Sequence, residues 1–76
     1  MIWLRVSCTR CTFSGGGYSN ASSGTVPAGT VITVTPYTGS SEGYWSGTVS
    51  KGPVSRASFT FTVNQNCNFV WSEVIN

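Results

Sequence analysis

The stretch that most constrains the fold runs from Gly24 to Gly47 and reads GTVPAGTVITVTPYTGSSEGYWSG. Every residue from Thr30 to Thr35 is β-branched, and threonines are interspersed with valine and isoleucine. Such a run suits the pleated, half-buried surface of a β-strand. Glycines and serines follow Pro36 and indicate a turn, after which Tyr44 opens another strand. We therefore predict a strand, a turn and a second strand here, with the remaining strands pairing with these two.

The flanking sequence predicts more strands by the same alternation of apolar and polar residues. It alternates from Ile2 to Thr9, from Ser58 to Val63 and from Cys67 to Val74, and the polar segment 64–66 indicates a hairpin turn. No window shows the apolar period of about 3.6 residues that is typical of a helix. We expect one all-β domain spanning residues 1–76, a small antiparallel sheet or sandwich of five to seven short strands.

Two segments predict irregular structure. The segment SGGGYSNASSG, from Ser14 to Gly24, contains three consecutive glycines, which raise the entropic cost of order. We expect a flexible loop over about residues 14–24. The tripeptide Lys51-Gly52-Pro53 indicates a turn.

Size and charge limit the classes of protein that this chain can represent. Charged residues make up 8% of the 76 residues, against about 25% in an average soluble domain. A domain this small buries only about 60% of its unfolded surface, so contact with another subunit would add to its stability. The net charge is +2, and the four cations are scattered, so we expect no nucleic-acid partner. No apolar run reaches about 18 residues, and the N-terminus lacks the features of a signal peptide, so we expect no membrane insertion.

The order of several short segments matches a known pattern. They are an aliphatic strand at 4–6, Gly-Thr-Val at 24–26, Ala-Gly-Thr-Val-Ile-Thr-Val-Thr at 28–35, Gly-Tyr-Trp-Ser-Gly at 43–47, Phe-Thr-Phe-Thr-Val at 59–63 and Asn-Cys-Asn-Phe at 66–69. This order resembles the divergent InlB B-repeat, also called the bacterial repeat domain. The resemblance implies a small β-grasp-like module that serves as a spacer or binding stalk on cell-surface proteins, without enzyme activity. The cysteines are not part of the common pattern, and the repeats usually occur inside long exported chains.

Three cysteines are candidates for a disulfide or a metal site. Cys8 and Cys11 have CxxC spacing. A zinc site usually has four Cys or His ligands, and the chain has no histidine. The three cysteines would therefore need Glu42 or Glu73 as the fourth ligand. A redox CxxC belongs at a helix N-terminus, so we expect neither a metal nor a redox site. Cys8 and Cys67 fall on the inward faces of the first and last strands. If these strands pair, Cys8–Cys67 is the preferred disulfide. In a cytoplasm the two thiols would stay reduced.

Catalysis is not expected from these residues. The chain has no histidine or aspartate that could activate a serine. A paired-carboxylate mechanism would need Glu42 and Glu73 on opposite sides of a cleft. We therefore predict no catalytic residue and no cofactor.

Exposed aromatic residues are the predicted interface. The candidates are Trp3, Tyr37, Tyr44 and Trp45, and three roles stay open for them: core packing, a subunit interface, or stacking on sugars. Trp45 is expected to pack against the sheet, so that its loss harms folding, whereas loss of Trp3 is expected mainly to weaken assembly.

The low charge and small core predict a structural role. A bacteriophage virion component, made in the host cytoplasm and docked in many copies on a capsid, tail or fibre, fits both features. We expect it to dock through its edge strands, which offer unpaired backbone groups, and through the exposed aromatic residues. The alternative is a carbohydrate-binding or adhesin module of a bacterial cell-surface protein, with surface glycans as partners.

Overall fold

The computed structural model describes residues 2–37 and 41–74, which form nine strands and no helix. In chain order the strands are β1 (Trp3–Thr9), β2 (Cys11–Gly15), β3 (Tyr18–Ala21), β4 (Ser23–Pro27), β5 (Val31–Pro36), β6 (Glu42–Gly47), β7 (Lys51–Ser55), β8 (Phe59–Thr62) and β9 (Cys67–Glu73). The predicted all-β class is confirmed, and the strands outnumber the five to seven expected. Within these residues, no helix is present that could cross a membrane.

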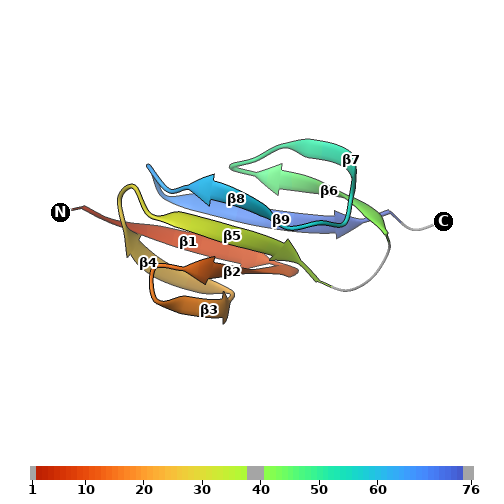
Figure 1. Cartoon of the computed structure of the whole chain (residues 1–76). Helices are drawn as coiled ribbons and strands as arrows, with labels where there is room; N and C mark the ends of the chain where they lie inside the picture. The colour runs from red at the N-terminus through yellow and green to blue at the C-terminus, as the bar shows by residue number, and fades with distance from the viewer. Residues whose placement is uncertain (1, 38–40, 75–76) are drawn as a thin grey trace.

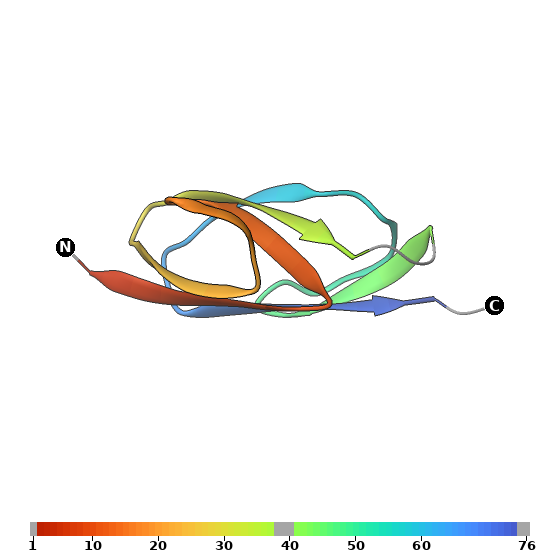
Figure 2. The same ribbon diagram turned by 90° about the horizontal axis from the view of Figure 1, so that it is seen from below.

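The strands form a two-layered sandwich. Sheet A has the order β4-β1-β9-β6-β7, and sheet B has the order β3-β2-β5-β8. Figure 2 shows the sheets as two layers, and the N- and C-termini lie at opposite ends of the long axis (Figure 1). The first and last strands pair, which was the condition for the Cys8–Cys67 disulfide: β1 and β9 are parallel neighbours, with Val6 opposite Cys67. The other strand pairs are antiparallel.

The core lies between the sheets and follows from the alternation within each strand. Each strand that alternates turns every second side chain inward. The fully or almost fully buried hydrophobic residues are Val6, Cys11, Phe13, Val26, Ile32, Val34, Trp45, Val63, Cys67, Phe69 and Trp71. Aromatic rings dominate one half of the core, where Trp45 contacts Phe59 and Trp71 at centroid distances of 5.1 and 5.0 Å. Tilted and edge-on ring pairs of this kind add to the stability that area burial provides.

The two strands predicted in the central stretch are present as β5 and β6 but do not form a hairpin, and residues 38–40 of the turn predicted between them lie outside the described residues. β5 lies in sheet B between β2 and β8, whereas β6 lies in sheet A between β9 and β7, so these two strands are not paired. The segment 64–66 is likewise not a hairpin turn, because it carries the chain from β8 in sheet B to β9 in sheet A. Both connections cross between layers, and local alternation does not distinguish a crossing from a hairpin.

The loop expected over residues 14–24 is largely replaced by regular structure. It contains the end of β2, all of β3 and the start of β4. Gly15, Gly16 and Gly17 have φ values of 127°, 60° and 91° and form the tight turn of the β2–β3 hairpin. This left-handed region strains other residue types, so the glycines serve the turn and not flexibility. The turn predicted at residues 51–53 is also part of a strand, since β7 begins at Lys51.

Candidate functional site

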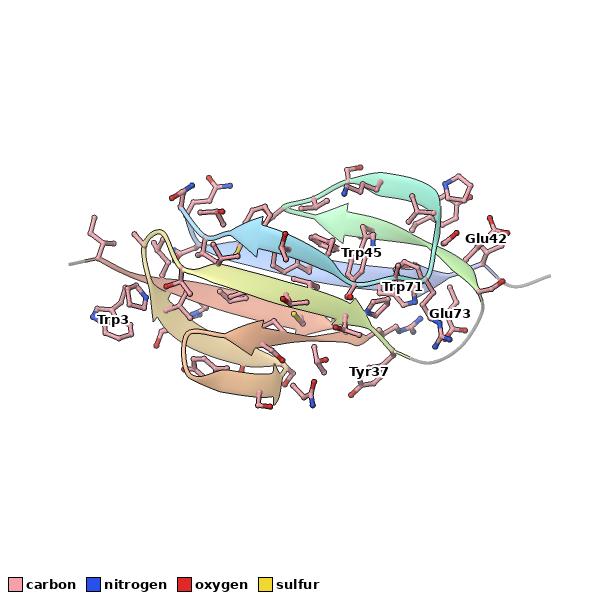
Figure 3. The ribbon with its side chains drawn as sticks, in the orientation of Figure 1. Trp3, Tyr37, Glu42, Trp45, Trp71 and Glu73 are labelled. Carbon is pink, nitrogen blue, oxygen red and sulfur yellow. The ribbon has the colours of Figure 1, made fainter. Side chains whose placement is uncertain are left out.

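Three of the four aromatic residues predicted at an interface are exposed. The exposed fractions of Trp3, Tyr37 and Tyr44 are 60%, 56% and 46%. Figure 3 shows Trp3 and Tyr37 at the outside of the sandwich. The prediction that these side chains are available for contact with a partner is therefore compatible with their positions.

Trp45 is not an interface residue. It is only 3% exposed, and its ring lies between the sheets beside Trp71 (Figure 3). Tyr44 and Trp45 are neighbours on one strand, so their side chains point to opposite faces of sheet A. The expectation that Trp45 packs against the sheet is confirmed, and its inclusion in the interface was wrong.

A shallow polar groove of about 490 Å³ lies on the outer face of sheet A. It is lined by Trp3, Arg5 and Ser7 of β1, by Thr25 of β4 and by residues 66–68 at the start of β9. The register places Arg5 opposite Thr25, and Ser7 opposite both Ser23 of β4 and Asn68 of β9. Hydroxyl, amide and guanidinium groups therefore form a continuous polar floor beside one exposed indole ring.

Hydrogen bonds hold two parts of this polar groove in place. The backbone N–H of Arg5 donates to Oδ1 of Asn66 at 2.9 Å, and the amide nitrogen of Asn66, which makes no hydrogen bond within residues 2–37 and 41–74, can donate to a ligand. At the neighbouring edge, the backbone N–H of Thr25 donates to the hydroxyl of Tyr18 at 3.0 Å. The ring of Tyr18 covers Gly24, where a Cβ would collide with it. A second depression, lined by Arg5, Ser7, Tyr18 and residues 23–25, continues the groove in this direction.

The outer face of sheet A continues from the polar groove to a second exposed ring. Tyr44 lies opposite Ser72, and Ser72 is four residues beyond Asn68 on β9. Asn68 lies opposite Ser7, which is four residues beyond Trp3 on the parallel strand β1. At about 3.3 Å per residue, the eight steps separate Trp3 and Tyr44 by about 26 Å along the strand direction on one face.

The outer face of sheet B has a different character. Its outward residues on β2, β5 and β8, which we call the threonine face, are Thr12, Ser14, Val31, Thr33, Thr35, Thr60 and Thr62. They form cross-strand neighbours, with Thr33 between Ser14 and Thr60, and Val31 opposite Thr62. None of these side chains is charged, and Val31 is 57% exposed. Tyr37 follows β5 and shares this face by alternation.

The four strands at the edges of the sheets differ in how open they are. On β4, the backbone N–H of Thr25 that faces away from β1 donates to the hydroxyl of Tyr18, so it is not available to another strand. On β7, Pro53 lacks an N–H group that could pair with another strand. β3 is short and contains Asn20 at a φ of 51°. In the described part of the chain, β8 forms its ladder with β5 alone, so one side of β8 is open. Of the predicted docking edges, β8 is the most suitable for sheet extension.

The cysteines are all free thiols, and the sheet register argues against the Cys8–Cys67 disulfide. Cys67 lies opposite Val6, and Cys8 lies opposite Phe69. A diagonal offset of two residues on adjacent strands separates the Cα atoms by about 8 Å, more than the roughly 7 Å that a disulfide tolerates. β1 and β9 do pair, but their stagger separates these two thiols.

Cys8 contacts the thiol of Cys11 across the turn between β1 and β2. This hydrogen bond, with burial, raises the pKa of Cys8 above its ordinary value. The same hydrogen bond lowers the pKa of Cys11, although burial acts in the opposite direction. Burial raises the pKa of Cys67. The Cys11 thiol also contacts the carbonyl oxygen of Phe69 at 3.5 Å.

The two carboxylates lie far from the polar groove. Glu42 and Glu73 are both at the end of the sandwich opposite Trp3 (Figure 3). Among residues 2–37 and 41–74, no group of three or more His, Cys, Asp or Glu side chains could hold a metal ion. Sequence reasoning identified Trp3 but missed Arg5, Asn66 and Asn68, because only the pairing register brings them together.

No protein-family model, curated protein or solved structure matches this chain. The resemblance to the divergent InlB B-repeat therefore stays a prediction from the sequence.

Proposed function

We propose that this chain is a non-enzymatic structural subunit that docks on a larger assembly, and that a bacteriophage virion is the assembly it suits best. It would occur there in many copies as a capsid decoration or as a tail or fibre subunit, made in the host cytoplasm. Its partners would be other virion structural proteins, with no nucleic-acid contact and no membrane insertion.

The observation that carries this proposal is the uncharged threonine face. A docked face must lose its water, and desolvating a charge costs far more than desolvating a hydroxyl that can find a new hydrogen bond. The threonine methyl groups, Val31 and Tyr37 add apolar area, which contributes about 25 cal/mol per Å² when buried. In the described part of the chain, the open edge of β8 borders this face, and a partner strand could add main-chain hydrogen bonds there.

The size of the chain makes such a contact matter for stability. The accessible surface is 4480 Å², and a standard protein interface covers about 800 Å² on each partner. One contact would therefore cover roughly a fifth of this surface. A domain of this size has little stability to spare, so burial at that scale would add substantially to it.

A second candidate function is supported by the other side of the molecule. The polar groove and the exposed ring of Trp3 favour a carbohydrate-binding or adhesin module of a bacterial cell-surface protein. The resemblance to the InlB B-repeat implies the same cellular setting.

The docking proposal is tested by placing a charge at the centre of the threonine face. Thr33→Lys should leave the fold intact, because Thr33 is exposed, and should prevent incorporation into particles made by the cells that produce this protein. The matched control is Thr9→Lys, an exposed threonine on the outer face of sheet A. Mass spectrometry of purified particles should find the Thr9→Lys chain and not the Thr33→Lys chain. Equal incorporation of the two variants would contradict docking through the threonine face.

A further inference from the structure

The polar groove combines two chemical features that sugars require of a protein surface. A sugar ring has an apolar face of C–H groups, which can lie on a flat aromatic ring, and a periphery of hydroxyl groups. Trp3 is 60% exposed and presents its indole at the end of the groove. The floor supplies the donors and acceptors of Ser7, Thr25, Asn66 and Asn68.

The charge of the groove selects among sugars. Arg5 is the charged side chain in the lining, and no ion pair of Arg5 with a carboxylate occurs in the described residues, whose acidic groups lie at the other end of the sandwich. A guanidinium group binds carboxylates through two parallel hydrogen bonds. A carboxylate on the ligand would therefore complement the groove, whereas a nucleic acid would need several cations along its path.

The geometry points to a linear acidic oligosaccharide as the ligand of this face: we propose that a uronic acid unit binds in the polar groove with its carboxylate on Arg5 and its ring on Trp3. The chain of sugars then runs along β1 and β9 toward Tyr44. The two residues lie about 26 Å apart along the strand direction on the same face, and the positions between them on β1 and β9 include Ser7, Asn68 and Ser72. Only a ligand long enough to cover this distance contacts both rings.

This inference specifies the ligand of the second candidate function, and it concerns the sheet opposite the threonine face. The groove and the docking face can therefore fail separately. A chain that is docked through sheet B would leave sheet A free to bind a glycan.

The test is a titration of the full chain, followed by isothermal calorimetry, with galacturonic acid oligomers and with neutral galactose oligomers of the same lengths. The acidic oligomers should bind at least about tenfold more tightly, a difference of about 1.4 kcal/mol. Absence of binding by the acidic oligomers, or equal affinity for the two series, would overturn the proposal.

Three variants assign the roles of the residues. Trp3→Ala should abolish measurable binding of both series, and Arg5→Gln should remove the preference for the acidic series. Tyr44→Ala should weaken the binding of long oligomers and not that of oligomers too short to reach it.

The control is Tyr37→Ala, an exposed aromatic residue outside sheet A, which should not change the binding of either series. Because Trp3, Arg5 and Tyr44 are all exposed, the variants should keep the circular dichroism spectrum of the parent. Full binding by Trp3→Ala, or a preference kept by Arg5→Gln, would contradict the assignment.

Discussion

Replacement of Trp45 by alanine should destabilise the fold more than any change at the exposed aromatic residues. Trp45 is 3% exposed and joins sheet A to sheet B through its contact with Phe59 of β8. It also packs on Trp71 at 5.0 Å between ring centroids. The alanine variant would lose both ring contacts and leave a cavity between the layers.

The expected loss is a large share of the total stability. Truncation of a buried aromatic residue to alanine costs about 3–5 kcal/mol. At about 0.05–0.15 kcal/mol per residue, a chain of this length has a free energy of unfolding of about 4–11 kcal/mol. The Trp45→Ala variant should therefore lose from roughly a quarter to all of its stability.

The assay is urea unfolding followed by far-ultraviolet circular dichroism, which does not depend on tryptophan fluorescence. With an m-value of about 1 kcal/mol per M for a small domain, the midpoint should fall by about 3–5 M or the folded baseline should be lost. The matched control is Trp3→Ala, which truncates the same residue type on the same sheet and should change the free energy of unfolding by less than about 0.5 kcal/mol. A loss below about 1 kcal/mol for Trp45→Ala, or equal losses for both variants, would refute the reasoning.

Two further predictions concern local packing and titration. Gly24→Ala should lower the midpoint of urea unfolding, because the added Cβ collides with the ring of Tyr18. The double variant Gly24→Ala with Tyr18→Ala should lose less stability than the sum of the two single variants, and strictly additive losses would contradict the collision. Buried Cys67 should lower the free energy of unfolding as the pH rises above about 8.5, by up to about 1.4 kcal/mol per pH unit, because the thiol ionises there in the unfolded chain and keeps its proton in the folded one. Below that pH both states are protonated, so this contribution is constant. Denaturant unfolding at several pH values should show a smaller slope for Cys67→Ala than for the parent, and equal slopes would contradict the stated cause.

Part of the fold could be predicted because strand alternation is a local property. The alternation of Ile2–Thr9, Ser58–Val63 and Cys67–Val74 located β1, β8 and β9 and their buried faces. It carries no information on which sheet a strand joins, so it did not reveal that β5 and β6 lie in different sheets. β3 was missed because Ser14–Gly24 contains few apolar residues to alternate.

The candidate site was predicted less well than the fold. Alternation alone places Tyr44 and Trp45 on opposite faces, so the sequence already held the information that only one of them is exposed. The polar groove depends on the pairing of Arg5 with Thr25 and of Ser7 with Asn68. That register follows from how the whole core packs, and a single sequence does not display it. The stagger that separates Cys8 from Cys67 was hidden for the same reason.

The central claim, that this chain works as a docked subunit, is tested most directly by the mass of the native complex. The chain is purified under native conditions from the cells that produce it, and the mass of its complex is measured by native mass spectrometry. Amide hydrogen exchange is measured on the same complex and on the isolated protein. The account predicts a particle with many copies of the 8.1 kDa chain, in which amides of β5 and β8 exchange more slowly than in the isolated protein. A free monomer as the sole native species, with identical exchange in β5 and β8, would contradict it.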